Sequence, residues 1–275
     1  MRRPRKAGGI AVVLLGLLAG CFPGSGSSRT SLIQGIRGLT GPSSDCLHVQ
    51  TTLIEQPAGD AYLNKGLWAA AGKPLPHELS TLLAMNGLRV GVFTGNPPGE
   101  FERLISSEHS TVNPTFRTMQ PGKPKLVPIN GPIERVEYRS FATVSSDPTR
   151  TTALAAECGL SLTAWPADDQ RVRLVCELQL QHGERQSFIA PNAAGTAFDR
   201  QERKILETFP ALIWEVTLAP GDYLVVGANS DPAETLGEAF FFPTVNGVVR
   251  QRVAVVKAAH GLTTDAPPLP TRPAK

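Results

Sequence analysis

Motifs that carry well-known metal or nucleotide chemistry are missing from this sequence of 275 residues. Its five histidines are scattered, and none belongs to a His-Glu-x-x-His or Cys-x-x-Cys arrangement that would bring metal ligands together. We therefore expect no metal and no cofactor, and we interpret the histidines as surface or hydrogen-bonded residues. They are His48, His77, His109, His182 and His260.

The motifs of common catalytic sites are missing as well. The globular part has no Gly-x-Ser-x-Gly elbow, no phosphate-binding loop and no dinucleotide-binding glycine fingerprint. Paired carboxylates are the hardest chemistry to exclude, and Asp168-Asp169 is one such pair. It falls on an expected hairpin turn, where solvent would surround both side chains, so we favour a plain turn and assign no catalytic residue.

Aromatic residues are sparse, at 6% of the sequence. Trp68, Trp165 and Trp214 could form a stacking platform for a sugar or for peptidoglycan. Tryptophans at the ends of helices and strands are more often core anchors, which is the interpretation we favour.

The sequence has a single long apolar run, from Ile10 to Leu18. It is too short for the roughly 20 residues that a membrane-spanning helix needs. A basic start precedes it and small residues follow it, which is the order of an export signal. We therefore expect residues 1–20 to be a signal peptide and the body to lie outside the bilayer. The basic residues are Arg2, Arg3, Arg5 and Lys6.

The residues Leu18-Ala19-Gly20-Cys21 resemble the lipobox of bacterial lipoproteins. The resemblance implies that Leu18, Ala19 and Gly20 are recognised by the signal peptidase, which cuts the bond before Cys21. The Cys21 thiol would carry diacylglycerol, the new amino group is often acylated in this family, and two or three chains would anchor the protein durably. Two alternatives are ordinary secretion with an incidental cysteine and a transmembrane helix that stays in place.

An anchor on Cys21 implies a place in the bacterial cell envelope, on the exported side of a membrane. The second mature residue would be Phe22 and not aspartate. By the sorting rule of the lipoprotein family, this favours the outer membrane over the inner one. The residues that follow are rich in glycine and serine, so we expect 21–44 to be a flexible tether.

The formal net charge of +3 belongs mostly to the signal peptide. Residues 1–20 contain four basic and no acidic side chains, so their removal leaves the mature chain at −1. Proteins that bind nucleic acid concentrate lysine and arginine on one surface, so we expect no nucleic-acid partner.

Three cysteines besides Cys21 remain in the mature chain: Cys46, Cys158 and Cys176. An exported protein meets conditions in which disulfides persist. A hairpin that turns near residues 167–169 would bring Cys158 and Cys176 near each other diagonally, which predicts a disulfide between them. The alternative is three buried free thiols, since a free cysteine packs as a small apolar side chain.

Residues 45–120 predict a small α+β module. A β-branched segment over 45–55 indicates a strand, and leucines at helical spacing indicate a helix that begins near Pro76 and ends at Asn86-Gly87. A strand over 88–93 follows, and then a helix that turns Phe101, Leu104 and Ile105 inward.

Residues 121–260 predict an antiparallel β-rich domain, a sheet or a sandwich of hairpins. The segment 171–181 alternates most clearly, with one apolar and one polar face. The segment 199–209 is ambiguous because helix-forming residues dominate it, and the proline-rich tail 261–275 should be disordered. The fold class is thus α+β and β-rich. Further strands are expected at 135–142, 212–218, 223–228, 238–242 and 248–257.

Three segments near the C-terminus resemble, in order, the closing part of bacterial secretin pore subunits. That family has a strand that ends in glycine, a turn with Leu-Gly and phenylalanine, and a final β-branched strand. With the residues between the segments, the match covers about 40 residues, and it lacks the proline-rich sequence of the family. They are 218–228, 235–241 and 252–256.

These observations favour a lipid-anchored cell-envelope protein with a non-enzymatic structural or protein-interaction role. Its expected partners are the membrane, through the lipid on Cys21, and envelope proteins. One alternative is a lipid-anchored hydrolase that acts on cell-wall or nutrient polymers. A further alternative, which rests on the C-terminal resemblance, is a secretin-like or secretin-associated assembly subunit.

Overall fold

The computed structural model describes residues 47–192, 196–229 and 234–260. They belong to one compact unit that spans residues 42–275. The expected signal peptide, tether and tail at 1–20, 21–44 and 261–275, together with Cys21 and Cys46, lie outside the described residues. Within the described ranges, no helix is both long and apolar enough to cross a membrane.

Strands dominate the structure: they account for 57% of it and helices for 17%, which confirms the predicted α+β, β-rich class. The helical elements are short. They are η1 (Tyr62–Gly66), α2 (Leu67–Ala70), α3 (His77–Met85), α4 (Gly99–Ser106), η2 (Pro210–Leu212) and α5 (Leu236–Phe241).

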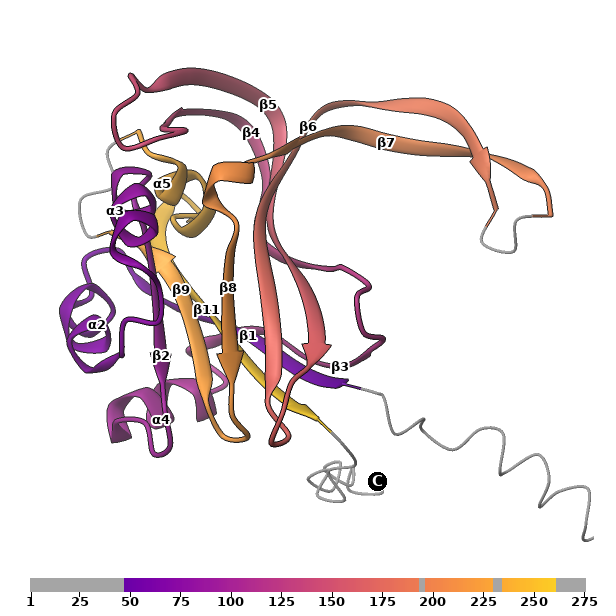
Figure 1. Ribbon diagram of the computed structural model, residues 1–275. Helices are drawn as coiled ribbons and strands as arrows, with labels where there is room; N and C mark the ends of the chain where they lie inside the picture. Colours follow the sequence, from indigo (N-terminus) through magenta and orange to yellow (C-terminus); the bar gives the residue numbers. More distant parts are fainter. Residues whose placement is uncertain (1–46, 193–195, 230–233, 261–275) are drawn as a thin grey trace, which may run out of the picture. The chain divides into compact units, whose positions relative to one another are not determined.

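The strands form two antiparallel sheets (Figure 1). The first sheet has the order β2-β9-β11-β1-β3, with β10 paired to β11. Its strands are β1 (Leu47–Pro57), β2 (Leu88–Phe93), β3 (Thr111–Met119), β9 (Tyr223–Ala228), β10 (Thr244–Val245) and β11 (Val248–His260). The second sheet has the order β4-β5-β6-β7, with β8 paired to β6. Its strands are β4 (Lys125–Ser140), β5 (Thr149–Pro166), β6 (Val172–Pro191), β7 (Phe198–Thr208) and β8 (Trp214–Leu218).

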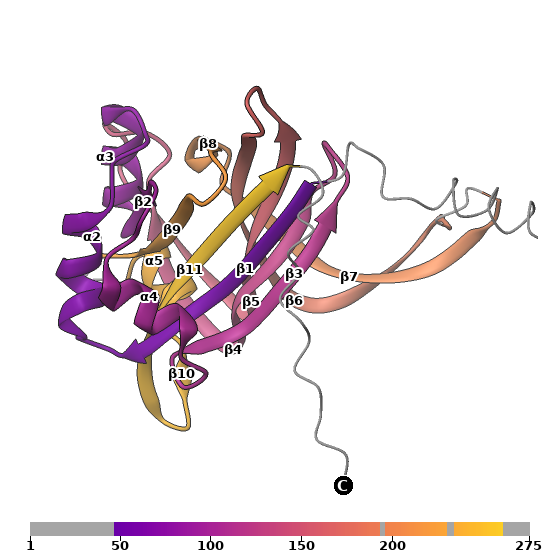
Figure 2. The same ribbon diagram turned by 90° about the horizontal axis from the view of Figure 1, so that it is seen from below.

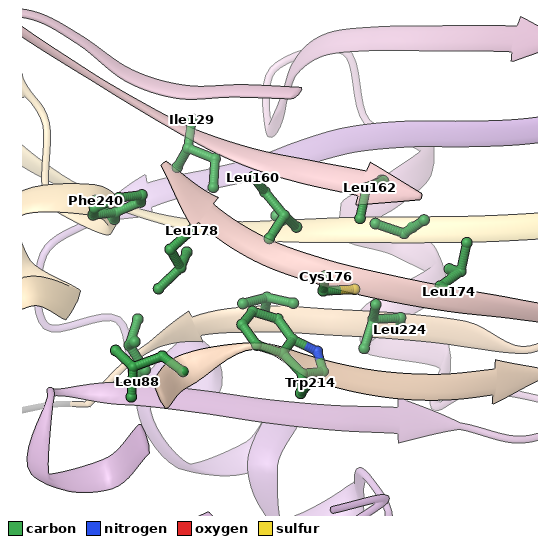
Figure 3. Close-up of a cluster of buried hydrophobic side chains, with 14 of the residues drawn as sticks. Leu88, Ile129, Leu160, Leu162, Leu174, Cys176, Leu178, Trp214, Leu224 and Phe240 are labelled. Atoms are coloured by element: carbon green, nitrogen blue, oxygen red, sulfur yellow. The ribbon is translucent and has the colours of Figure 1, made fainter. Parts of the chain in front are cut away.

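The main core contains residues from both sheets. Trp214, Cys176 and Leu178 of the second sheet lie in one cluster with Leu224 and Leu88 of the first sheet, as Figure 3 shows. All of them are at most 2% exposed. The pattern predicted for 171–181 is confirmed, because the alternate residues of β6 from Val172 to Leu180 are all buried. Burial of these side chains is the main favourable contribution to folding.

A second, smaller core lies on the other face of the first sheet. Val253 and Val255 of β11 pack there against Leu63 and Leu67 of η1 and α2 and against Phe101 of α4. The neighbouring residues of β11 belong to the main core. Because this part of β11 is buried on both faces, its residues 253–256 are all apolar instead of alternating.

The boundary expected near residue 120 does not separate two sheets. Strands β9 and β11, from the predicted second domain, pair with β2 and β1 of the predicted first module. The register of β1 and β11 runs from Leu47 opposite His260 to Pro57 opposite Arg250. Residues 45–120 are therefore not a separate module in this structure, because their strands are completed by the last strands of the chain.

One local expectation is corrected, and one ambiguous segment is assigned. The segment 238–242, expected as a strand, lies mainly in helix α5, where the Thr235 hydroxyl accepts a hydrogen bond from the Glu238 backbone N–H at 3.3 Å. Such a side-chain cap satisfies a free N–H group of the first turn and favours a helix start. The ambiguous segment 199–209 lies almost wholly in strand β7. The expected helix stop is confirmed, since Gly87 has φ +76°.

Candidate functional site

Strands β6 and β7 extend beyond the sandwich as a two-stranded ribbon. We call residues 182–191 and 198–206 the arm. Figures 1 and 2 show from two directions that this part of β6 and β7 projects away from the other strands. The apolar face of β6 ends at Leu180, and from Glu184 to Ser187 every side chain is exposed. The arm therefore leaves the sandwich where the regular apolar alternation of β6 ends.

The arm exposes apolar side chains that no other described part of the chain covers. Ile189 is 76% exposed and Phe198 is 73% exposed. Ile205 and Leu206, nearer the root, are also about half exposed. An isolated two-stranded ribbon is only marginally stable in water, and apolar side chains grouped on a surface are typical of contact sites. The arm is therefore the candidate contact surface of the described structure.

A β-bulge lies where the arm begins. The register between β6 and β7 shifts between His182 and Gln186, and Gly183 in this interval has φ +77°. Bulges bend the strand and increase its twist, and they redirect side chains near functional sites. The bulge therefore lies at the point where β6 bends away from the sandwich and the arm begins.

Polar contacts tie the root of the arm to the sandwich. The Tyr138 hydroxyl of β4 donates a hydrogen bond to Glu207 Oε2 of β7 at 2.7 Å, and His182 Nε2 lies 3.7 Å from the same oxygen. Burial and the neighbouring Glu207 carboxylate raise the pKa of Tyr138 above its ordinary value. Lys204 Nζ donates to Glu157 Oε1 of β5 at 2.8 Å. These contacts hold β7 against β4 and β5 at the root.

Further contacts hold the two strands of the arm together. The Arg200 guanidinium donates to Ser187 Oγ at 2.8 and 3.0 Å, and Arg203 lies over the Phe188 ring, 4.7 Å from its centroid. Cross-strand pairs of this kind are the unit of stabilisation in a sheet. They give the ribbon a defined side-chain arrangement although it lies outside the core.

The second sheet ends in β4 on one side and in β7 and β8 on the other. Within the described ranges, no strand pairs with the outer edge of β7. The outer edge of β4 has one bridge, between Arg139 and Thr235. Unpaired strand edges present N–H and C=O groups that can pair with another chain.

The predicted disulfide is corrected: Cys158 and Cys176 are both free and buried. Cys158 lies opposite Leu180 and Cys176 lies opposite Leu162, so the two cysteines are offset by four residues along neighbouring strands. That offset is roughly 13 Å at the rise of a strand, whereas the Cα atoms of a disulfide lie at most about 7 Å apart. Burial raises the pKa of Cys158 to about 12 and also raises that of Cys176.

The three tryptophans lie in different places. Trp214 is buried in the main core, as predicted for an anchor. Trp68 lies beside Arg89, whose guanidinium carbon is 5.8 Å from its ring centroid. Trp165 has the same relation to Arg173 in the second sheet, also at 5.8 Å. They therefore do not form one stacking platform.

The polar candidates of the sequence are likewise dispersed. Asp168 and Asp169 are exposed in the turn between β5 and β6, as the turn interpretation predicts. Among the residues whose placement is described, no group of three or more His, Cys, Asp or Glu side chains could hold a metal ion. His182 lies at the root of the arm, and His48 stacks on Phe116 with ring centroids 5.4 Å apart.

Sequence reasoning missed the arm. The signal was present: after Leu180 the alternation of β6 gives way to a run without apolar side chains over 181–187, and β7 is charged or polar from Asp199 to Lys204. A hairpin without a continuous apolar face cannot cover a core, so this pattern favours a ribbon that projects.

Comparisons with known proteins assign no family. No protein-family model and no curated protein matches the sequence. Among solved structures, the chain is similar to the InvG secretin domain β-barrel from the Salmonella SPI-1 injectisome NC-base. The alignment has 10% sequence identity and a TM-score of 0.24, and covers 86% of this chain and 70% of that chain. So distant a likeness carries no argument about function.

Proposed function

We propose that this chain is a lipid-anchored protein of the bacterial cell envelope that binds another envelope protein through the arm and has no catalytic role of its own. The observation that carries the proposal is the arm, a projecting ribbon that exposes Ile189 and Phe198. A protein that folds stably gains nothing from holding large apolar side chains in water, whereas a binding surface needs them.

The anchor belongs to the same proposal and rests on the lipobox residues Leu18-Ala19-Gly20-Cys21. A tether from Cys21 would restrict the arm to partners at or near the same membrane, which raises their effective concentration. The second mature residue, Phe22, favours the outer membrane.

Site-specific photo-crosslinking in native membranes tests the interaction. A photoreactive amino acid at position 198 should give a discrete adduct with a second protein. The matched control is position 144, because Val144 is also an exposed apolar residue but lies in the loop between β4 and β5. Absence of an adduct at 198, or equal adducts at both positions, would contradict the arm as the contact surface.

The anchor has its own test, the mass of the mature amino terminus. Lipid on Cys21 should appear as an added diacylglycerol mass, and Cys21→Ser should leave the precursor uncut or release the protein from the membrane. An unmodified Cys21, or cleavage at another bond, would contradict the lipoprotein assignment without affecting the crosslinking result.

The unpaired outer edge of β7 favours a second candidate function, that of a secretin-like or secretin-associated assembly subunit. An antiparallel sheet that ends in such an edge can be continued by a strand of another copy, and repeated head-to-tail contacts of this kind close into rings. In this case the crosslinked adduct at position 198 is a second copy of the chain, and the protein runs as a large, heat-resistant oligomer in detergent. A monomer on sizing contradicts this candidate.

A further inference from the structure

A groove lies at the outer edge of β2, the edge strand of the first sheet. Helix α2 contributes Leu67 to the smaller core, and α3 contributes Leu82 and Leu83 to the main core. The groove has a volume of about 900 Å³, within the range of roughly 300–1,000 Å³ that is usual for ligand sites. Apolar side chains such as Trp68, Leu75 and Leu83 line part of it.

The edge of β2 is only partly occupied by the chain itself. Gly72 donates its N–H to the Val92 carbonyl at 2.9 Å and accepts from the Val92 N–H at 3.0 Å. Backbone groups that point to one edge of a strand recur every second residue, so those of Val90 also point outward, into the groove. No strand in the described part of the chain pairs with Val90 on that side.

Two prolines explain why the chain does not fill this edge. Continued antiparallel pairing from Gly72 opposite Val92 would place Pro74 opposite Val90 and Pro76 opposite Leu88. Proline has no N–H group and cannot donate to a neighbouring strand. The chain turns away after Gly72, and the edge at Val90 remains open to a strand from another molecule.

The charged side chains that line the groove are all basic. Lys65, Lys73 and Arg89 line it together with His77, and its lining contains no aspartate or glutamate among the residues described. This contrasts with the mature chain, whose formal charge is slightly negative. The concentration of positive charge favours an acidic ligand.

Within the described ranges, Arg89 has neutral partners only. Its Nε donates to Asn229 Oδ1 at 2.6 Å and its Nη1 donates to the Asn64 carbonyl at 2.8 Å, while the guanidinium lies beside the Trp68 ring. Burial lowers the pKa of Arg89, and no carboxylate among the described residues offsets that effect. A partly buried guanidinium usually pairs with a carboxylate or phosphate, and its second terminal nitrogen makes no hydrogen bond within the described ranges.

The open edge of β2 distinguishes between kinds of anionic ligand. The N–H and carbonyl groups of Val90 point outward and pair with no strand in the described part of the chain. A ligand that supplies both an N–H donor and a carbonyl acceptor can pair with both groups. Inorganic phosphate at neutral pH offers mostly acceptors, whereas a peptide offers both N–H donors and, through acidic side chains, carboxylates.

We propose that the groove binds an extended acidic peptide segment of a partner protein, which adds to the edge of β2. Backbone N–H groups of the peptide bond the Val90 carbonyl, and its carboxylates pair with Arg89, Lys65 and Lys73. This mode of recognition takes its affinity from main-chain hydrogen bonds and its specificity from side chains. The groove uses the first sheet and the arm uses the second, so this proposal does not depend on the proposed function.

The test is fluorescence anisotropy with the full chain in mild detergent and three labelled, end-blocked pentapeptides. The first has the sequence Val-Glu-Val-Glu-Val, the second has glutamine in place of glutamate, and the third is the acidic peptide with N-methylated backbone amides. We expect the first peptide to bind and the other two to bind about tenfold or more weakly. The glutamine peptide lacks the carboxylates, and the N-methylated peptide lacks the backbone N–H donors.

A charge-reversed variant, Lys65→Glu with Lys73→Glu, should weaken binding of the acidic peptide by about tenfold. Both lysines are exposed, so the fold should persist. The matched control is Lys123→Glu with Lys125→Glu, which changes the net charge equally at exposed positions of the second sheet and its preceding turn, and should leave binding unchanged. An equal loss in both variants would contradict the proposal.

Other outcomes also overturn the proposal. Failure of the wild-type chain to bind the acidic peptide at low salt excludes the ligand class. Equal binding of the N-methylated peptide, together with displacement by inorganic phosphate, would identify a site for small oxyanions and contradict strand addition. Equal binding of the glutamine peptide would contradict the role of charge.

Discussion

The hydroxyl of Tyr138 donates a hydrogen bond to the Glu207 carboxylate at 2.7 Å across 69 residues of sequence. Tyr138 is fully buried in β4, whereas Glu207 lies at the end of β7, where the arm joins the second sheet. This contact links the second sheet, which is stabilised by its buried apolar core, to the arm, which lies outside that core.

Removal of this hydrogen bond should lower the free energy of unfolding. Tyr138→Phe keeps the ring and leaves a partly buried carboxylate without its donor, and we expect a loss of about 1–3 kcal/mol in urea unfolding. The control is Glu215→Gln, which removes only an exposed ion pair with Arg173, at 3.7 Å, and should change stability by less than about 1 kcal/mol. Equal stability of Tyr138→Phe and wild type would show that the contact does not stabilise the root of the arm.

Gly237 should tolerate no side chain. A Cβ at this position would lie 2.0 Å from the Gly87 carbonyl oxygen and 2.5 Å from its carbon, both backbone atoms. We expect Gly237→Ala to lower the free energy of unfolding by about 3 kcal/mol, because α5 must move away from the Asn86-Gly87 turn. The matched change Gly99→Ala, at the start of α4 where no atom lies within 4 Å, should be neutral or slightly stabilising. Comparable melting temperatures for the two variants would contradict the close approach of α5.

Stability should fall at alkaline pH. Burial raises the pKa of Cys158 from 9.0 to about 12 and also raises that of Cys176, so both thiols stay protonated in the folded state when the unfolded chain loses its protons. The folded state then binds more protons, and the stability present below about pH 9 is lost as the pH rises toward 12, with a slope of about 1.4 kcal/mol per pH unit for each thiol.

The pH dependence is measured by urea unfolding at a series of pH values. Cys158→Ala with Cys176→Ala should be less stable at neutral pH but should show a shallower decline above pH 9. A decline of the same slope in both proteins would assign it to other groups, such as Tyr138, whose raised pKa acts in the same direction at still higher pH.

The two buried thiols should react only after unfolding. In a Cys46→Ser background we expect slow alkylation of Cys158 and Cys176 in the native protein and rapid alkylation of both in denaturant without reductant. Peptide mapping by mass spectrometry follows each site separately. Protection in denaturant that only a reductant removes would reveal a disulfide, and would contradict the register that offsets the two residues by four positions.

The sequence by itself determined the local features of this protein. The alternation of β6 predicted its buried face, and the leucines of α3 followed by Asn86-Gly87 predicted a helix and its end. Periodicity and turn chemistry act over a few residues, so they can be read without knowledge of distant neighbours. The resemblance of Leu18-Ala19-Gly20-Cys21 to a lipobox is likewise a local pattern, and the lipid anchor that it implies stays a prediction.

Only the tertiary structure decided which strands share a sheet. β1 pairs with β11 about 200 residues away, and this pairing unites the two segments that composition had divided near residue 120. Helix α5 also depended on distant contacts: Phe240 and Phe241 suggested a strand, but the Gly237 N–H bonds the Asn86 carbonyl at 2.9 Å and the phenylalanines are buried in the core. Tertiary packing of this kind overrides a modest local preference.

The sites were likewise decided in three dimensions. The sequence predicted that Cys158 and Cys176 lie near each other across a hairpin, but the strand register offsets them by four residues. Arg89 belongs to a basic groove because the fold brings α2, α3 and β2 together. The sequence shows that the apolar alternation of β6 ends after Leu180, where the arm begins. That it projects, and that Ile189 and Phe198 remain uncovered, depends on which surfaces the rest of the chain leaves open.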